Sequence, residues 1–258
     1  MARVHLFEFE DFQWFPAFIR NYMTDFLQFV SNRFDIYKAI VPRLSNVINQ
    51  TGSQQIVDLA SGGGGGLLRL SEHLKEAHPE LKIVLTDFYP NIPAFEHTVA
   101  QSSVFTYYPK SVDAMNVPSE LTGLRTQFLS LHHFRPGDAV KILQNAVDSG
   151  SPIALFESQE RNVKSIISMI FSPLSVIFTT PFIRPFKVGR IIFTYLIPIV
   201  PLFILWDGIV SALRTYSEKE MQELVSRVEG HEKYTWEIGK QKSGPASIPY
   251  LIGYKKNV

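Results

Sequence analysis

The sequence predicts an α/β fold in which helices wrap a doubly wound, mostly parallel sheet. Three observations predict it: an apolar stretch that ends at an acid and runs into five consecutive glycines, an alternation of strand-like and helical patterns over residues 53–160, and two further strand-like stretches near the end of the chain. Strands that alternate with helices are typical of a parallel sheet covered on its faces. At 258 residues with 45% hydrophobic content, the chain can bury one large core, with or without an appended subdomain.

The composition excludes several classes of function. The net charge is +1 and the charges are mixed along the chain, so no basic surface predicts nucleic-acid binding. The chain has no cysteine, which excludes disulfides and thiol catalysis and fits an intracellular, cytoplasmic location. The histidines show no metal-ligand spacing, so we expect no metal site. Acids among the first apolar residues, such as Glu8, are unlike a signal peptide.

Residues 1–52 are expected to form an N-terminal helical lid. A second helix is predicted from Phe34 past Pro42 to Ile48, and it ends at the turn 51–53. The helices either cover an edge of the sheet or shield a reacting centre from water, and both roles can hold together. The first helix shows apolar residues at three- and four-residue steps, as one buried face requires: Phe15, Phe18, Tyr22, Phe26, Phe29 and Val30.

Residues 53–160 carry the alternating pattern. The predicted strands are 55–59, 81–86, 104–108, 124–131 and 152–156, and the predicted helices are 67–77, 92–100 and 136–147. In such sheets ligands bind at the carboxyl ends of the strands, where the strand order reverses. Polar side chains fall at those ends: Asp58, Asp87, Asp113, His132, His133 and Glu157.

The glycine run predicts a nucleotide-type cofactor site. Glycine lets the backbone take positive φ and lets a ligand approach the main chain, and the N–H groups at a helix start suit a polar or anionic group. Asp58 would hold the glycine turn or a cationic part of the ligand. Asp87 can accept two hydrogen bonds from a ribose diol, or cap the following turn. Asp113 can accept one from an adenine amino group, or be a solvated loop acid.

The stretch Asp58-Leu59-Ala60-Ser61-Gly62-Gly63-Gly64 resembles the first motif of the class I S-adenosylmethionine-dependent methyltransferases, E/D-x-G-x-G-x-G, with Ala60 in place of its first glycine. The resemblance covers roughly residues 50–160 and implies a last strand that is antiparallel. It implies S-adenosylmethionine as cofactor, with Gly62 and Gly64 as the main glycine contacts and with Gly65 and Gly66 only lengthening the turn. The cofactor-binding residues that it implies are Asp58, Ala60, Gly62, Gly64, Asp87, Phe88, Asp113, Ala114 and Ser130.

Two other functions stay open. A dinucleotide-binding oxidoreductase needs G-x-G-x-x-G, but a motif that starts at Gly62 meets Leu67 at its third glycine position. A motif that starts at Ala60 already fails at its first position. The other alternative is a non-catalytic protein with the methyltransferase fold that serves as a binding partner or scaffold.

The expected catalytic residues are His132, His133 and Glu157. The two histidines follow the fourth strand, where the family places residues between cofactor and substrate. Histidine is suited to be a base because its ordinary pKa lies near neutrality, although either ring can instead pack or bind the backbone. Glu157 would orient a histidine or pair with Arg161 one helical turn on.

The insert, residues 163–213, contains two uncharged stretches. They hold 19 residues between Lys164 and Arg184 and 16 residues from Ile191 to Trp206, and prolines interrupt both. A membrane-spanning helix needs about 20 apolar residues, so three structures are open: a buried cap that forms a substrate pocket or dimer contact, an interfacial element on a membrane, and spanning helices. The first two favour a small hydrophobic methyl acceptor. The partners expected are therefore an apolar small molecule, a peripheral membrane contact and a second copy of the chain.

Residues 214–258 return to the sheet. Ser217 and Glu220 form a capping-box pattern for a helix that runs to Val228. Strands are predicted at 234–238 and 249–254. The expected cofactor-binding domain therefore comprises residues 53–162 and 214–258, with the insert between its two parts.

Overall fold

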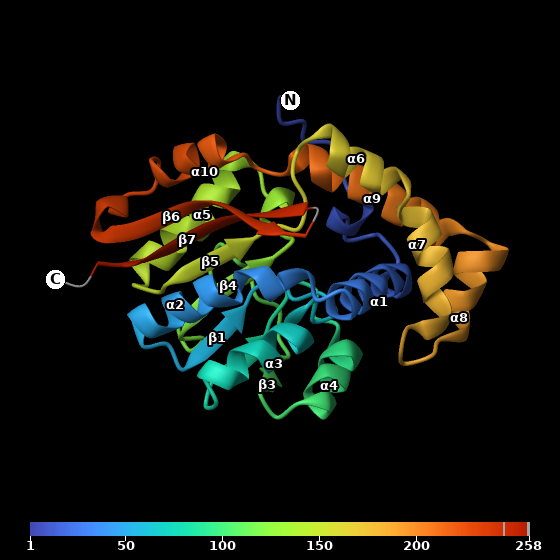
Figure 1. Ribbon diagram of the computed structural model, residues 1–258, viewed down its shortest axis with the longest axis horizontal. Coiled ribbons are helices and arrows are strands. Elements are labelled where there is room, and N and C mark those ends of the chain that lie inside the picture. The colour runs from blue at the N-terminus through green and yellow to red at the C-terminus, as the bar shows by residue number, and fades with distance from the viewer. Residues whose placement is uncertain (245, 257–258) are drawn as a thin grey trace.

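In the computed structural model, which describes residues 1–244 and 246–256, seven strands form one sheet (Figure 1). The spatial order is β3-β2-β1-β4-β5-β7-β6. All neighbours from β3 to β5 are parallel, whereas β7 is antiparallel to both β5 and β6. The strands are β1 (Gln55–Asp58), β2 (Lys82–Leu85), β3 (Phe105–Tyr107), β4 (Leu124–Phe128), β5 (Ile153–Phe156), β6 (Tyr234–Ser243) and β7 (Ala246–Lys255).

This topology confirms the predicted doubly wound sheet with an antiparallel last strand. The chain builds outward from β1 in one direction to β3, and then returns to add β4 and β5 on the other side of β1. The order therefore reverses between β1 and β4, which pair in parallel from Ile56–Leu124 to Asp58–Thr126. A ligand crevice is expected beyond the carboxyl ends of these two strands.

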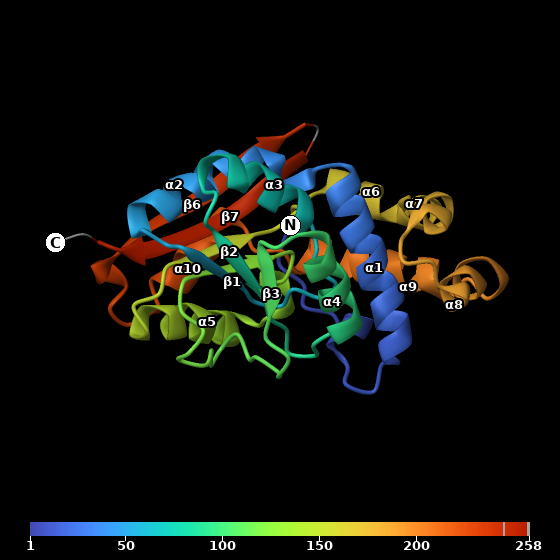
Figure 2. The same cartoon turned by 90° about the horizontal axis from the view of Figure 1, so that it is seen from below.

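Helices cover both faces of the sheet (Figure 2). Successive residues of a strand point to opposite faces, so Ile56 packs in the apolar cluster on one side and Val57 in the cluster on the other. The first face carries α2 (Val41–Thr51), α3 (Leu67–Ala77) and α4 (Ile92–Gln101). The second carries α5 (Pro136–Asp148) and α10 (Glu218–Val225).

Several boundaries differ from the sequence prediction for local reasons. The fourth strand ends at Phe128 rather than at 131, because Leu129 has φ +54° and a 3-10 turn follows at Leu131–His133. The segment after Phe34 begins as a 3-10 turn, Ile36–Ile40, and Gly52 ends α2 with φ +61°. The capping box of α10 forms as predicted between Ser217 and Glu220, but this helix ends at Val225.

The helix α1 (Ala17–Arg33) joins the sheet to the insert (Figure 1). Phe15, Ile19 and Phe26 form an apolar cluster with Val176 and Ile204 of the insert. Of the predicted aromatic face, Phe18 instead lies 47% exposed. The insert folds into α6 (Val163–Ile170), α7 (Ser172–Thr179), a 3-10 turn (Thr180–Phe182), α8 (Val188–Ile191), a π-helical turn (Ile192–Leu196) and α9 (Ile199–Arg214).

Helix lengths in the insert bear on the membrane-spanning alternative. Within the described ranges, none of the helices taken singly has both the length and the apolar character to cross a membrane. Two helix pairs meet these criteria of length and composition together, but they are bent by 41° and 78°.

The first twelve residues lie along α9. The Val4 N–H donates to the Leu213 carbonyl, the Trp206 indole N–H donates to the Phe7 carbonyl, and Asp207 accepts from the Phe9 N–H at 2.9 Å. The N-terminal segment is therefore fixed to the last helix of the insert, although about two hundred residues separate them in sequence.

Gly66 provides a test of the packing between α1, the 3-10 turn after it and the glycine turn. A Cβ atom on Gly66 would lie 2.6 Å from Cδ2 of the buried Tyr37 ring, whereas one on Gly137 would meet nothing within 4 Å. We expect Gly66→Ala to lower the free energy of unfolding by about 1–3 kcal/mol through overpacking. Gly137→Ala, in the first turn of α5, should be neutral or stabilise by up to about 1 kcal/mol. Urea denaturation measures both, and equal effects would contradict the tight packing at Gly66.

Candidate active site

A cavity of about 580 Å³ opens where the strand order reverses. Its sheet side is formed by the turns that follow β1, β2 and β4 and by the loop after β3. Its other side is formed by α1 and the N-terminal segment, which contribute Arg20, Thr24, Glu10 and Asp11 among others. Residues of the N-terminal segment and of α1 therefore form the side of the cavity opposite the strand ends.

Asp58 holds the glycine turn from behind. Its side chain is buried, and its two carboxylate oxygens accept hydrogen bonds from the hydroxyls of Ser61 and Thr126, both at 2.7 Å. Burial raises the pKa of Asp58 to about 7, although these two hydrogen bonds oppose the rise. Asp58 does not line the cavity. Of its two expected roles, the structure shows the one that holds the turn.

Asp87 joins the glycine turn to the end of β2. One carboxylate oxygen accepts from the Gly62 N–H at 2.7 Å and the other from the Tyr89 N–H at 2.8 Å. Asp87 thus caps the turn that follows it and also lines the cavity. A carboxylate has about four lone-pair positions, so both oxygens can still accept hydrogen bonds from a ligand.

Four further expected cofactor contacts also line the cavity: Phe88, Asp113, Ala114 and Ser130. Asp113 and Ala114 lie in the loop after β3, where Asp113 accepts from the Met115 N–H at 2.9 Å, and the Phe88 ring is exposed at the rim. Ser130 follows β4 and is 5% exposed, yet its hydroxyl has no hydrogen-bond partner among the described residues. The same holds for the amide nitrogen of Asn91, another lining residue. Unpaired buried polar atoms on a cavity wall are suited to a polar ligand.

The glycines are used differently from the sequence prediction. Gly62 lines the cavity as expected. Gly64 does not line it, because this glycine faces Thr98 and Gln28 on the other side of the turn. The expectation that Gly65 and Gly66 only lengthen the turn is wrong, because both line the cavity and Gly66 packs against Tyr37.

Backbone strain is concentrated at the cavity. Of the three non-glycine residues with positive φ in the described chain, two line it: Ala60 at +59° and Leu129 at +54°. An L-residue in this conformation costs roughly 1–2 kcal/mol. The value at Ala60 explains why glycine stands at this position in the family motif. Such strain is commonly found at functional sites.

The two histidines after β4 occupy different environments. The His132 ring is 1% exposed and lies outside the cavity lining, with Nδ1 2.8 Å from a Glu157 oxygen. Glu157 also accepts a hydrogen bond from the His132 N–H. Glu157 was expected to contact either a histidine or Arg161, and the structure shows the contact with a histidine. Arg161 pairs with Glu220 instead. Of the two histidines after β4, His133 is the one that lines the cavity.

A buried ionic network surrounds His133, and the sequence analysis did not identify it. Arg214 donates to Glu8 at 2.9 Å, to Asp11 at 2.8 Å and to the His133 carbonyl at 2.8 Å. Asp11 also lies 2.8 Å from His133 Nδ1. Two features of the sequence could have indicated this network. Acids lie among aromatic residues at the start of the chain, and Asp207 and Arg214 lie seven residues apart on an otherwise apolar helix.

Two groups on the cavity wall have raised pKa values, the imidazole of His133 and the carboxyl of Glu10. Burial alone would lower the pKa of His133, but Glu8 and Asp11 outweigh it and raise the value to about 9. Burial and the nearby Asp207 raise the pKa of Glu10 to about 8, and one Glu10 oxygen has no hydrogen-bond partner in the part of the chain that the structure describes. The raised pKa of His133 favours its charged form at neutral pH, in which the imidazole donates hydrogen bonds.

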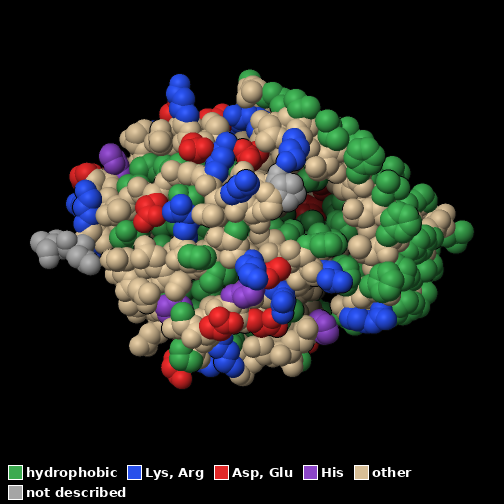
Figure 3. Space-filling view, in the orientation of Figure 1, with side chains coloured by type: hydrophobic (Ala, Val, Ile, Leu, Met, Phe, Trp, Pro, Cys, Tyr) green, Lys and Arg blue, Asp and Glu red, His purple; other side chains and the backbone are tan. Residues whose placement is uncertain are grey.

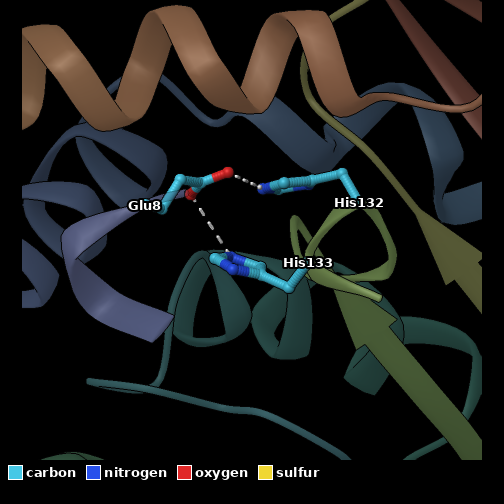
Figure 4. A group of neighbouring side chains, drawn as sticks. All are labelled: Glu8, His132 and His133. Atoms are coloured by element: carbon cyan, nitrogen blue, oxygen red, sulfur yellow. Dashed lines mark ion pairs between the residues drawn. The ribbon is translucent and has the colours of Figure 1, made fainter. Parts of the chain in front are cut away.

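Glu8, His132 and His133 also form a group of metal-binding side-chain types (Figure 4). One potential ligand atom from each lies within 4.8 Å of the others. Arg214 already provides a positive charge at 2.9 Å from the Glu8 carboxylate, and each histidine has its Nδ1 against another carboxylate. Charge balance at this group is thus supplied by the protein's own side chains.

The strand order, the antiparallel β7 and the glycine turn at the switch point define the class I S-adenosylmethionine-dependent methyltransferase fold, and the chain has this fold. No protein-family model matches the chain, and no curated protein matches its sequence.

The chain is similar to several solved structures. The plantazolicin methyltransferase BpumL, in complex with a pentazolic desmethylPZN analog and SAH, aligns over 93% of this chain and 99% of its own, with a TM-score of 0.55 and 12% identity. The pyocyanin biosynthetic protein PhzM aligns over 86% of this chain with a TM-score of 0.50 and 14% identity. A putative O-methyltransferase from Nostoc punctiforme aligns over 89%, also with a TM-score of 0.50 and 14% identity. The alignments cover 55% and 60% of these last two proteins.

Removing Arg214 tests the ionic network. Arg214→Met leaves Glu8 and Asp11 without their shared cation, and breaking a buried ion pair in this way costs about 3–5 kcal/mol in the free energy of unfolding. The matched control is Arg69→Met, whose partner Glu72 is 60% exposed, so at most about 1 kcal/mol is expected. Chemical denaturation measures both variants. A loss at Arg214 no larger than at Arg69 would show that the network does not stabilise the fold.

Proposed function

We propose that the protein is an S-adenosylmethionine-dependent methyltransferase that acts on a small hydrophobic acceptor. One observation carries the proposal: the glycine turn, Asp87, Asp113 and Ser130 line a single cavity at the switch point of the sheet. The fold supports it, and so does the SAH that is bound to the structural neighbour BpumL.

The residues present fit this cofactor. Asp87 keeps free lone pairs for the ribose hydroxyls, and the Ser130 hydroxyl has no other partner in the described structure. Asp113 and Ala114 would lie beside the adenine, and the glycines let the ligand approach the main chain closely. When bound, S-adenosylmethionine supplies a methyl group that is already activated on its sulfonium sulfur. The protein is then left to align the acceptor and, where needed, to remove its proton.

Glu10 is the best-placed base for that proton. It lines the cavity, one of its oxygens is unpaired in the described structure, and its pKa is raised to about 8, close to an operating pH. Charged His133 also lines the cavity and can orient a polar group of the acceptor as a hydrogen-bond donor. His132 and Glu157 would act through His133 or the backbone, because neither lines the cavity.

The hydrophobic acceptor is supported by the cavity wall. Leu27, Phe88, Val112 and Phe134 contribute apolar surface between the charged and polar side chains that also line the cavity. Apolar wall surface of this kind holds apolar ligands, and placed polar groups fix their orientation.

Calorimetric titration with S-adenosylhomocysteine, NAD and NADP tests the cofactor. We expect binding of S-adenosylhomocysteine alone. Asp87→Ala should weaken that binding at least tenfold, or by about 1.4 kcal/mol, whereas Asp148→Ala, at the exposed end of α5, should leave it unchanged. Binding of NAD or NADP alone would favour the oxidoreductase alternative, and binding of none of the three would favour the non-catalytic scaffold. Unchanged affinity of Asp87→Ala would remove Asp87 from the ribose.

The pH dependence of methyl transfer tests Glu10. With an acceptor selected from a panel of apolar hydroxyl and amine compounds, kcat/KM should rise with pH and level off above about 8, because only the ionised carboxylate accepts a proton. Glu10→Gln should lower kcat by roughly 100- to 10,000-fold while the affinity for S-adenosylhomocysteine stays the same. If Glu10→Gln keeps both the rate and the inflection near pH 8, another group is the base.

A further inference from the structure

We propose that the exposed apolar face of the insert docks onto a membrane surface that contains anionic phospholipids. This surface, here called the insert face, is carried by the exposed side chains of α6 to α9. Its most exposed members include Phe171, Leu174, Phe178, Phe182, Phe186 and Leu196.

The size of the insert face distinguishes it from ordinary surface. Of the 24 large hydrophobic side chains that are exposed among the described residues, 15 lie between 163 and 206, so this exposure belongs to one segment rather than to the whole surface. Phe178 is 70% exposed and Leu196 is 77% exposed. Hydrophobic side chains form a continuous band along the insert in Figure 3. Continuous exposed apolar surface of this kind marks an interaction site.

The charges of the segment indicate an anionic partner. Residues 161–206 contain five Lys and Arg and no Asp or Glu. Asp25 on α1 pairs with Lys187 and Arg190, which holds those two cations on the protein side. Arg184 is exposed between the exposed rings of Phe182 and Phe186, and its guanidinium donates to the backbone carbonyls of Pro181 and Ile183. A cation among exposed aromatic rings matches the boundary between lipid headgroups and acyl chains.

The same charges disfavour a second copy of the chain as the occupant. In a two-fold symmetric dimer each surface meets itself, so the exposed Arg184 region of one copy would face the same apolar and basic segment of the other. This segment has no acid to complement the cation. An anionic bilayer provides both the apolar phase and the opposite charge.

The packing of the insert leaves the insert face free to contact a membrane, because the protein covers only the opposite side of the insert. Val176, Val200 and Ile204 are buried against α1, and Asp25 ties α8 to the same helix. One side of the insert is thus bound to the protein, while the other side presents its apolar residues outward (Figure 3). In an interfacial element with one apolar side, that side is typically buried about 5–10 Å into the boundary between the headgroups and the acyl chains.

Vesicle co-sedimentation of the full chain tests the proposal. Vesicles of equal parts phosphatidylcholine and phosphatidylglycerol should bind the protein more tightly than vesicles of phosphatidylcholine alone, and added salt should reduce this difference. The double variant Leu174→Asp, Phe178→Asp places two charges on one side of α7 and should weaken binding at least tenfold. The control is Phe34→Asp, because Phe34 is 65% exposed but lies outside the insert, and its binding should match the wild type. Arg184→Gln should weaken binding to the anionic vesicles only.

Folding and cofactor binding are followed separately. Circular dichroism melting and S-adenosylhomocysteine titration should be the same for the double variant and the wild type, so that a loss of vesicle binding reports the surface alone. The proposal is overturned if the wild type binds neither vesicle, or if the double variant binds like the wild type. It is also overturned if light scattering shows a wild-type dimer that the double variant turns into a monomer without any vesicle binding, since the occupant is then a second copy.

Discussion

Arg214 is the charge on which the arrangement of this molecule depends. Its guanidinium is 1% exposed, and a buried cation is tolerated only when carboxylates and carbonyls surround it. Glu8 and Asp11 supply the carboxylates, and the turn after β4 supplies the His133 carbonyl. The N-terminal segment must therefore lie between the end of α9 and the carboxyl end of the sheet. Glu10, between these two acids, is carried into the cavity by the same constraint.

The two sides of the cavity consequently have different origins. The side with the glycine turn, Asp87 and Ser130 is built by the sheet and its connections, which are common to the fold. The opposite side is built by the N-terminal segment, α1 and Arg214 at the end of the insert, all of which are held together by long-range ion pairs and by the apolar cluster around Phe15 and Val176. Under the proposed function, the first side binds the cofactor and the second selects the acceptor.

The sequence predicted the features that depend on local spacing. The helix over residues 67–77 and the capping box at Ser217 are set by nearby residues, and the structure has both as predicted. The antiparallel direction of the last strand followed from the resemblance to a known fold. The early end of β4 escaped prediction because it depends on the positive φ of Leu129, for which the sequence carries no signal.

The sequence indicated the side of the cavity that the strand ends and the glycine turn form, but not the opposite side. Which glycines face the cavity depends on Tyr37 and Thr98, which approach from distant elements. The pairing of Glu8 with Arg214 spans 206 residues, and no periodicity within either segment encodes it. An isolated imidazole titrates near neutrality, so the sequence suggests a base at His133, but it carries no signal for the two carboxylates that raise the pKa of this residue.

The helix α9 connects the two proposals. Its exposed residues Leu202 and Trp206 belong to the insert face, while Asp207 and Arg214 on its buried side fix the N-terminal segment at the cavity. A helix is stiff over its 16 residues, so docking of the insert face would set the position of the cavity relative to the membrane. An apolar acceptor partitions into the bilayer, where its concentration exceeds that in water. The two proposals thus support each other, because a hydrophobic acceptor would be found in the membrane on which the insert face docks. A polar acceptor that diffuses in water would give no role to the apolar cavity wall or to the insert face.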